Sequence, residues 1–428
     1  MYEYTHGGNA LFEGENQGII DLSANINPLG VPSAVLQAIT DEFVNLNSYP
    51  DSSSTKLRQS IANYEQLNPD WVFCGNGASD IIFRLPRAIK ARKVLVTAPT
   101  FSDYERAALS YGAQVTRHKL LPADGFQVTE SLINEVEESR PDLVFICNPN
   151  NPTGAVTSSA LIKQLLHSAK QQNTYVVIDE CFMDFVIDAA SASSVKLLEQ
   201  YPNLLILKAF TKIFALPGIR LGYALTTNSQ LIEGLYYHGS DWPVSNLAQA
   251  AGIAALSDAQ QYICEAQSFV REQRQSLQSG LVELGFQVFP SQANYVFIKN
   301  PHPFDLAAEL NHRGIRIRSC ANYHGLADNY YRIAVSNQAH NELLLQTIHS
   351  IINEQLSGQK SDQLHAEEAY YRASQDGEQS NLPLAEGASC QEKQRQETHK
   401  LSAQAVENFY TDETATRKQS TQPEGSSR

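Results

Sequence analysis

Short runs of branched apolar residues, separated by segments with helical periodicity, place the strongest constraint on the fold of this chain. Strands are expected at Val94–Ala98, Leu143–Cys147, Tyr175–Ile178, Leu204–Leu207 and Leu221–Leu225. All but the last are continuous Val-, Ile- and Leu-rich runs, which is typical of strands buried on both faces. Helical patterns separate them, at Ser79–Lys90, Ser102–Tyr111, Thr129–Glu138 and Ser158–Gln171. This alternation predicts an α/β fold with a mostly parallel sheet flanked by helices.

A second region follows, with a different order of elements. Helical patterns come first, at Val244–Leu256 and Ala259–Leu284. Strands and further helical patterns alternate after them, at Phe286–Phe289, Tyr295–Ile298, Pro303–Arg313, Ile315–Arg318, Tyr331–Val335 and Gln338–Glu354. This order predicts a smaller α+β domain over residues 241–356.

The composition changes near residue 357. From Gln359 to Arg428, Ser, Gln, Glu and Thr dominate and large apolar residues are sparse. Such a segment cannot bury enough apolar surface to offset the entropy of ordering it. Residues 357–428 are therefore expected to form a polar, disordered tail, with a short helix near Ser402–Tyr410.

The net charge of −14 argues against a general nucleic-acid binder and against adhesion to anionic membranes. A few local arginines could still bind an anionic small molecule. The six cysteines are scattered without a CxxC pair, so neither a disulfide framework nor a metal site is expected. The absence of a signal-peptide pattern and of an apolar run of ~20 residues favours a cytoplasmic protein.

Polar residues stand directly after several of the expected strands, where open α/β sheets carry their functional groups. Asp179 follows one such strand, and it is either a cap or structural ion pair, or a carboxylate facing a cationic ring nitrogen. Lys212 follows another, among apolar neighbours whose packing would lower its pKa and suit Schiff-base chemistry. The alternative for Lys212 is a solvated loop residue. Arg220 could bind a phosphate or form an ion pair.

Three further segments each have an ordinary and a chemical interpretation. Asn148–Gly154 has the composition of a turn, but after a buried strand its Asn side chains could reach a bound ring. Gly75–Asp80 is either a glycine turn with an N-cap or an anion site at a helix start. Phe101 would pack in the core or stack on a planar cofactor. Taken together, the Lys, Asp, Asn, Arg, anion site and aromatic match what pyridoxal phosphate requires.

These motifs resemble a known family. The fold-type I pyridoxal-phosphate enzymes of the aminotransferase superfamily are matched at Asn151–Gly154, Val177–Glu180 and Thr211–Tyr223. The histidinol-phosphate aminotransferase group within it is matched at Tyr49–Asp51 and Ala98–Phe101. The threonine-phosphate decarboxylases of cobalamin biosynthesis, which belong to this group, are matched at Thr5–Asn9, Asp21–Gly30 and Ile317–Tyr323. The resemblance covers roughly residues 5 to 350 and leaves out the tail.

The resemblance implies a fold and a cofactor site. It implies a seven-stranded-type sheet in a large domain over residues 46–240, and an N-terminal arm over residues 1–45 that contributes to the small domain and the substrate pocket. Lys212 would form the Schiff base with pyridoxal 5'-phosphate and return a proton to the substrate, and Asp179 would keep the ring nitrogen protonated. The other implied cofactor contacts are Asn151, Phe101, Gly77, Ala78, Thr211, Arg220 and Tyr49. Tyr49 would reach in from a neighbouring subunit, which implies a homodimer.

The resemblance also implies a substrate site and one departure from it. Arg332 matches the family's carboxylate-binding arginine, and the substrate phosphate would be held by His6, Asn27 and Arg318. Solvent exposure of His6 and ion pairing of the two arginines are the ordinary alternatives. The position of Ala209 is usually Ser or Thr in relatives, so one phosphate hydrogen bond worth ~1 kcal/mol is expected to be missing.

The leading functional hypothesis is decarboxylation of L-threonine O-3-phosphate by a member of this family. The alternatives are a histidinol-phosphate-type aminotransferase and, from another class, a non-catalytic cofactor-binding regulator or scaffold. The chain shows no helix-turn-helix segment beside the cofactor domain, which argues against a DNA-binding regulator. The anchors of the two enzyme hypotheses are shared, so the residues alone do not separate decarboxylation from transamination.

Overall fold

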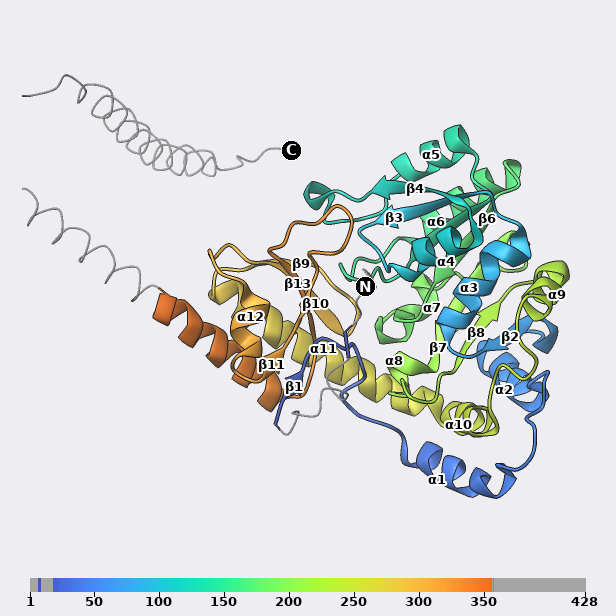
Figure 1. Ribbon diagram of the computed structural model, residues 1–428, viewed down its shortest axis with the longest axis horizontal. Coiled ribbons are helices and arrows are strands. Elements are labelled where there is room, and N and C mark those ends of the chain that lie inside the picture. Colours follow the sequence, from blue (N-terminus) through green and yellow to red (C-terminus); the bar gives the residue numbers. More distant parts are fainter. Residues whose placement is uncertain (1–6, 9–17, 356, 358–428) are drawn as a thin grey trace, which may run out of the picture. The chain divides into compact units, whose positions relative to one another are not determined.

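The computed structural model describes residues 7–8, 18–355 and 357. Its central feature is a seven-stranded sheet with the strand order β2-β8-β7-β6-β5-β3-β4 (Figure 1). β8 runs antiparallel to both of its neighbours, and the remaining pairs are parallel. The prediction of a mostly parallel sheet in an α/β fold is therefore confirmed. The strands are β2 (Val72–Gly75), β3 (Lys93–Ala98), β4 (Gln114–Lys119), β5 (Leu143–Cys147), β6 (Tyr175–Asp179), β7 (Leu204–Ala209) and β8 (Gly222–Leu225).

Helices cover both faces of this sheet, because alternate residues of each strand point to opposite sides. On one face, Phe145 and Val177 pack with side chains of α3, α4 and α9. On the other face, Ile146 and Ile178 pack with side chains of α2, α5, α6 and α10. These helices are α2 (Thr55–Glu65), α3 (Ala78–Ile89), α4 (Asp103–Tyr111), α5 (Ser131–Ser139), α6 (Ser159–Gln171), α9 (Ser229–Tyr237) and α10 (Asn246–Ser257).

A second, four-stranded antiparallel sheet has the order β12-β13-β10-β9. Its strands are β9 (Gln287–Phe289), β10 (Tyr295–Lys299), β12 (Arg318–Ser319) and β13 (Tyr330–Ala334). Near it, β1 (Ile20–Asp21) pairs in parallel with β11 (Ile315–Arg316), so the start of the described chain is joined to its C-terminal strands. The predicted domain boundaries at residues 45, 240 and 356 stay a prediction.

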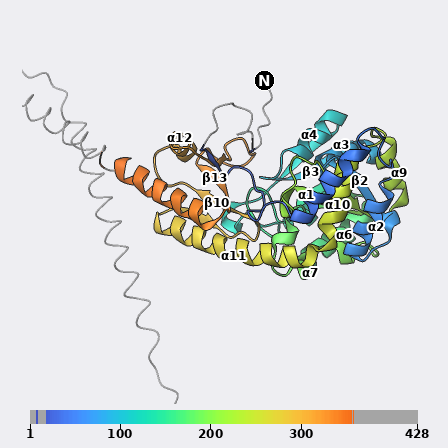
Figure 2. The same ribbon diagram turned by 90° about the horizontal axis from the view of Figure 1, so that it is seen from below.

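Long helices support the second sheet. α11 (Ala259–Glu283) lies beside the helix at 338–355, and Figure 2 shows the two running together. The contact is close, since a Cβ added to Gly280 would come 2.5 Å from a methyl carbon of Leu345. The remaining helices are α1 (Ser33–Glu42), α7 (Ala189–Ala192), α8 (Phe210–Ile213) and α12 (Leu306–Asn311).

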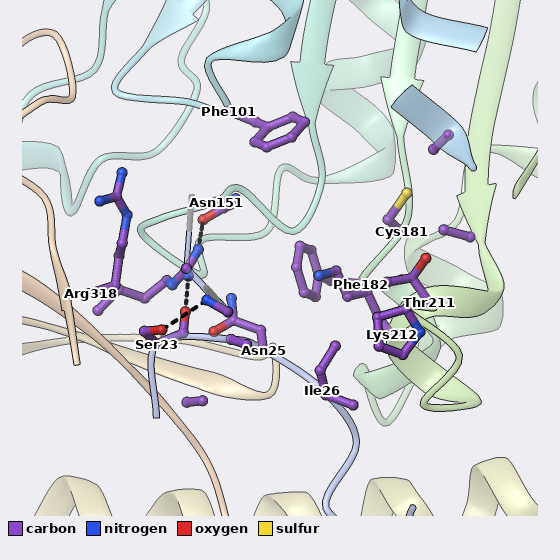
Figure 3. Close-up of a pocket in the computed structure, with 18 of the residues that line it drawn as sticks. Ser23, Asn25, Ile26, Phe101, Asn151, Cys181, Phe182, Thr211, Lys212 and Arg318 are labelled. Carbon is purple, nitrogen blue, oxygen red and sulfur yellow. Dashed lines mark hydrogen bonds between the residues drawn. The ribbon is translucent and has the colours of Figure 1, made fainter. Parts of the chain in front are cut away.

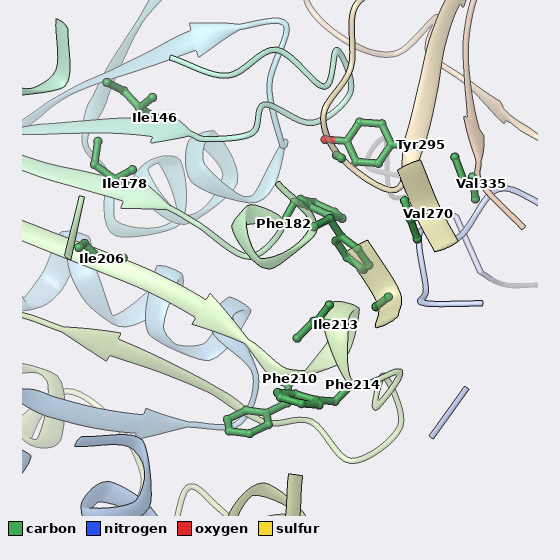
Figure 4. Close-up of a cluster of buried hydrophobic side chains, with 14 of the residues drawn as sticks. Ile146, Ile178, Phe182, Ile206, Phe210, Ile213, Phe214, Val270, Tyr295 and Val335 are labelled. Atoms are coloured by element: carbon green, nitrogen blue, oxygen red, sulfur yellow. The ribbon is translucent and has the colours of Figure 1, made fainter. Parts of the chain in front are cut away.

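One apolar core runs from the central sheet toward the second sheet (Figure 4). Ile178 and Ile206 belong to it on the side of the central sheet. Phe182 continues it, and its ring meets the ring of Tyr295 on β10 edge-on, with the centroids 5.1 Å apart. The loops at the carboxyl ends of the parallel strands are therefore packed against the second sheet, and this packing fixes their side chains.

Several elements were not expected from the sequence. β2 has four residues, and β4 is an edge strand in which Gln114, Arg117 and Lys119 are exposed, so neither carries a long apolar run. The strand β1 and the helices α1, α2, α7, α8 and α9 were also missed. The predicted tail from residue 358 onward, with the helix near Ser402–Tyr410, lies outside the described residues. In the part of the chain that the structure describes, no helix has the length and hydrophobicity needed to cross a membrane.

Candidate active site

A pocket of about 850 Å³ opens at the carboxyl ends of β5, β6 and β7 (Figure 3). Cys147, Asp179 and Ala209, the last residues of these strands, line it. The first residue of α3, the chain between β1 and α1, and side chains of β12 and β13 close it from other sides. The pocket therefore lies at the edge of the sheet where the parallel strands end, as the sequence predicted for the functional groups.

Lys212 lies in the short helix α8, which begins directly after β7. Its amine is 5.6 Å from the centre of the Phe182 ring, and no described carboxylate lies within ion-pairing distance of it. Burial, and then the positive charge of Arg332, lower the pKa of Lys212 to about 8. Roughly a tenth of the amine is therefore neutral at pH 7, far more than for an ordinary lysine, and the neutral form is the nucleophile.

Asp179 is 5% exposed at the end of β6. Its carboxylate accepts a 2.6 Å hydrogen bond from the Tyr104 hydroxyl and a 3.0 Å hydrogen bond from the Cys181 backbone N–H. The Tyr104 ring is stacked on Phe145, with the centroids 4.9 Å apart. The two bonds hold a carboxylate in a fixed position at the pocket, where it suits a cationic ring nitrogen.

An anion cradle is built where α3 begins. Gly77 precedes the helix with a φ of +79°, and a Cβ added there would come 2.6 Å from Nη2 of Arg220. A Cβ added to Gly222 would come 2.4 Å from the backbone nitrogen of Ala78. The guanidinium thus packs against the start of a helix, whose free N–H groups and dipole favour an anion. Thr211 also lines the pocket, so this donor set fits a phosphate group.

Arg332, on β13, is 6% exposed and is oriented by neutral oxygens. One terminal nitrogen donates a short hydrogen bond to the side-chain oxygen of Asn151, and the other donates a 2.7 Å bond to the carbonyl of Ser23. Its Nε is buried and has no hydrogen-bond partner among the described residues. An unpartnered charged donor at a pocket is costly, so it favours an anionic ligand.

Arg318 and Arg332 are directly opposite each other in the β12–β13 pairing, and both line the pocket. Arg318 donates a 2.8 Å hydrogen bond to Asn322, and its guanidinium lies 5.5 Å from the centre of the Tyr323 ring. Like charges at directly opposite positions destabilise a sheet. The pair therefore favours a ligand that brings negative charge to this side of the pocket.

Most of the residues predicted for the site line this pocket, namely Asn27, Ala78, Phe101, Asn151, Asp179, Thr211, Lys212, Arg220, Arg318 and Arg332. Gly77 lies beside them, in contact with Arg220. Tyr49 does not join them, because it is 80% exposed and stacks on Trp242 with the ring centroids 4.5 Å apart. His6 lies outside the described residues. The functional roles of all these residues stay predictions.

Two asparagines of the segment between β1 and α1 differ in their environment. The Asn27 amide nitrogen donates to the Ile213 carbonyl at 2.7 Å and to the Tyr262 hydroxyl at 3.1 Å, so both of its N–H groups are already bonded. Asn25 is 1% exposed and lines the pocket, and its Oδ1 has no partner among the described residues. The side-chain N–H groups of Asn25 also make no hydrogen bond to the described residues, so Asn25 has donors available for a ligand and Asn27 does not. The sequence did not single out Asn25, because spacing alone does not rank the two.

Comparisons with known proteins agree with this site. The family model of aminotransferase class I and II matches residues 17–348. The chain is 33% identical to threonine-phosphate decarboxylase from Salmonella typhimurium, over 82% of this chain and 98% of that protein. It is 32% identical to histidinol-phosphate aminotransferase from Lactiplantibacillus plantarum, over 77% of this chain and 91% of that protein. The solved histidinol-phosphate aminotransferase from Clostridium acetobutylicum is similar with a TM-score of 0.74 and 32% identity, over 78% of this chain and 100% of that one.

The chain belongs to the class I and II aminotransferase family. It is a pyridoxal-phosphate-dependent enzyme, and the prediction of this cofactor is confirmed. The residues fit the cofactor on structural grounds as well. The cradle at Gly77 and Arg220 suits its phosphate, the fixed carboxylate of Asp179 suits its ring nitrogen, and the amine of Lys212 suits its aldehyde.

Proposed function

We propose that this enzyme decarboxylates L-threonine O-3-phosphate to (R)-1-aminopropan-2-yl phosphate and carbon dioxide, supplying the aminopropanol linker of adenosylcobalamin. The observation that carries the proposal is the cross-strand pair of Arg318 and Arg332 in the pocket. Two guanidinium groups on one side of the pocket suit a substrate that carries two anionic groups. L-threonine O-3-phosphate carries both a carboxylate and a phosphate, and the Salmonella relative is named for this reaction.

We assign the two anionic groups to the two arginines. Arg332 would bind the carboxylate, because its buried Nε has no partner among the described residues. Arg318 would bind the substrate phosphate, together with the side-chain N–H groups of Asn25 or of the predicted Asn27. Since Arg220 already belongs to the cofactor cradle, the two phosphates would occupy different ends of the pocket.

The cofactor would be held by the groups around the ends of the parallel strands. We assign its phosphate to Gly77, Ala78, Thr211 and Arg220, its ring hydroxyl to Asn151, and its ring face to Phe101. When bound, pyridoxal 5'-phosphate supplies a cationic conjugated ring that accepts the electron pair released when a bond to the substrate α-carbon breaks. The Asp179 carboxylate, placed beside the ring nitrogen, would keep a proton on that nitrogen.

The reaction breaks the bond between the α-carbon and the carboxylate and replaces it with a bond to hydrogen. Arg332 would orient the carboxylate, and this orientation decides which bond at the α-carbon breaks. Lys212, with a pKa of about 8, can both hold and release a proton near neutral pH, so we assign it the delivery of that proton.

The second candidate is transamination of a phosphorylated substrate, as in the histidinol-phosphate aminotransferases. It is supported by the 32% identity to the Lactiplantibacillus enzyme, which is almost the same as the 33% identity to the Salmonella decarboxylase. Histidinol phosphate has no carboxylate, but the glutamate that transamination also uses has one. The two arginines would then bind two different substrates in turn, whereas in the decarboxylase both arginines would bind the same substrate.

The test is a substrate assay on the purified holoenzyme. We expect L-threonine O-3-phosphate to yield carbon dioxide and the amine in equal amounts, without loss of the cofactor aldehyde. Arg332→Gln should reduce kcat/KM by about 10- to 100-fold, as expected for a lost hydrogen bond to a charged group. Amino transfer from glutamate to imidazole-acetol phosphate, without release of carbon dioxide, would establish the aminotransferase and overturn the decarboxylase.

We also propose that the enzyme is a homodimer. Exposed apolar residues gather on α1 and the segment after it, at Leu36, Phe43, Val44, Leu46 and Tyr49. The Asn246 amide ties this segment to α10 through the carbonyls of Asn45 and Ser48, each at 3.0 Å. A rigid, apolar surface of this kind supports self-association. Light scattering should give twice the chain mass, and Val44→Asp should shift the protein toward the monomer.

A further inference from the structure

The backbone of Gly7 and Gly8 passes in direct contact with Ser23. A Cβ added to Gly7 would come 2.2 Å from the Ser23 carbonyl oxygen and 2.7 Å from its carbonyl carbon. Both atoms belong to the backbone, so they cannot move aside as a flexible side chain would. The Gly8 N–H also donates a 3.1 Å hydrogen bond to the Ser23 hydroxyl. Only glycine at position 7 therefore permits this approach.

Ser23 is fixed by its own neighbours as well. Its backbone N–H and its hydroxyl both donate to the same carboxylate oxygen of Asp21, at 2.8 and 2.6 Å. Asp21 belongs to β1, whose pairing with β11 anchors it. The position of the Ser23 carbonyl is thus determined from the β1 side and from the Gly7–Gly8 side.

The same carbonyl accepts the 2.7 Å hydrogen bond from Arg332 (Figure 3). The other terminal nitrogen of Arg332 bonds Asn151, and the guanidinium lies 5.6 Å from the centre of the Tyr295 ring. Two oxygens and one ring therefore set the plane of the guanidinium. Because the Ser23 carbonyl is one of these three contacts, a shift of that carbonyl would rotate the guanidinium and change the direction of its unpartnered Nε–H group.

We propose that Ser23, held by the backbone of Gly7 and Gly8, is a positioning residue that sets the orientation of Arg332 and thereby the site of the substrate carboxylate. The inference rests on the proposed function in that it takes Arg332 to bind a carboxylate. It adds a requirement for glycine at position 7 and a role for Ser23 that involves no contact with the substrate. Carboxylate recognition should therefore be sensitive to two residues that leave the charge of the pocket unchanged.

The experiment measures binding of two unreactive probes to the holoenzyme by calorimetry. 3-Phosphoglycerate carries a phosphate and a carboxylate, and glycerol 3-phosphate carries the phosphate without the carboxylate. The ratio of their dissociation constants reports carboxylate recognition alone. We expect the wild-type protein to prefer 3-phosphoglycerate. Ser23→Ala removes the hydroxyl's bonds to the Asp21 carboxylate and to the Gly8 N–H but keeps the carbonyl, so it should reduce this preference by about fivefold.

Gly7→Ala should have the larger effect, about tenfold or more, because the added Cβ would displace the Ser23 carbonyl and weaken its hydrogen bond from the charged Arg332. Neither variant should change the affinity for glycerol 3-phosphate. In an Arg332→Gln background, Ser23→Ala should have no further effect on the ratio. Ser60→Ala is the matched control, because the Ser60 hydroxyl bonds only the Lys56 carbonyl on an exposed helix surface, at 3.0 Å.

The outcomes separate the two proposals. If the wild-type protein shows no preference for 3-phosphoglycerate, the pocket has no carboxylate site, and this result would contradict the proposed function. A wild-type preference that Ser23→Ala and Gly7→Ala both retain would overturn the positioning role and leave the proposed function intact. An equal loss of affinity for both probes would also overturn it, because a general distortion of the pocket would then explain the data.

Discussion

Two lysines on either side of the end of β7 have opposite environments. Lys208, within the strand, is 5% exposed and pairs with Glu65 at 2.9 Å and with Asp184 at 3.7 Å. Lys212, one turn further on, faces the Phe182 ring and has no described carboxylate within ion-pairing distance. The two residues have the same side chain and are four positions apart, so their difference isolates the effect of the surroundings.

The comparison shows that burial alone does not decide the chemistry of a lysine. Burial disfavours the charged form of Lys208, but the carboxylates of Glu65, Asp184 and Glu180 outweigh it and raise the pKa well above the usual range. Burial and the charge of Arg332 act together on Lys212 and lower its pKa to about 8. Lys208 therefore remains a structural cation, and Lys212 becomes a candidate nucleophile.

The largest effect is expected for Lys212→Ala. Without the amine, the chain loses both its covalent attachment point for the cofactor and its proton donor, so kcat should fall by about 10³-fold or more. Steady-state kinetics and the absorption spectrum of the holoenzyme measure the two losses separately. If Lys212→Ala retains wild-type turnover, another group performs the chemistry and the contrast between the two lysines has no functional meaning.

Lys208→Met should instead lower stability. Removal of the cation leaves the carboxylates of Glu65, Asp184 and Glu180 buried without compensation, which costs about 3–5 kcal/mol. Urea unfolding of the apoprotein measures this cost. Adding Glu65→Gln to the variant should recover part of it, because one uncompensated charge is then gone. Unchanged stability of the single variant would show that the cluster is neutralised by protonation rather than by Lys208.

The pH dependence of cofactor uptake by the apoprotein tests the low pKa directly. Only the neutral amine attacks an aldehyde, so the rate should rise with pH through a midpoint of about 8 and level off above it. An ordinary lysine, with a pKa of about 10.4, would give a rate that still rises at pH 9. Stopped-flow absorbance after removal of the cofactor gives the profile, and a midpoint above pH 10 would contradict the assigned environment.

The difference between the two lysines also marks what the sequence could predict. Lys212 and Asp179 were found because each follows an apolar strand, which is a local pattern. The partners of Lys208 were not predictable, because Glu65 is distant along the chain and meets Lys208 only through the packing of α2. The edge strand β4 was missed for a related reason, since an edge strand needs no apolar run.

The substrate side of the pocket depends still more on distant contacts. Arg318 and Arg332 face each other through a strand register that no local pattern specifies. The choice of Asn27 over Asn25 followed a motif, whereas the bonds of Asn27 to Ile213 and Tyr262 are fixed by long-range packing. Motifs therefore identified the segments that form this part of the site, and packing decided which of their side chains are available.

The smallest effect in the comparison is expected when the Phe182 ring, which lies next to the Lys212 amine, is removed. An aromatic face stabilises an ammonium by ~0.5–2 kcal/mol, so Phe182 should oppose the lowering of the pKa rather than cause it. Phe182→Leu should then move the midpoint of cofactor uptake below 8, by roughly half a unit or more. Phe214→Leu is the matched control, because its ring stacks on Phe210 and Tyr262. A midpoint that is the same in both variants would mean that burial and Arg332 set the pKa of Lys212 without the ring, and that the contrast with Lys208 is one of charges alone.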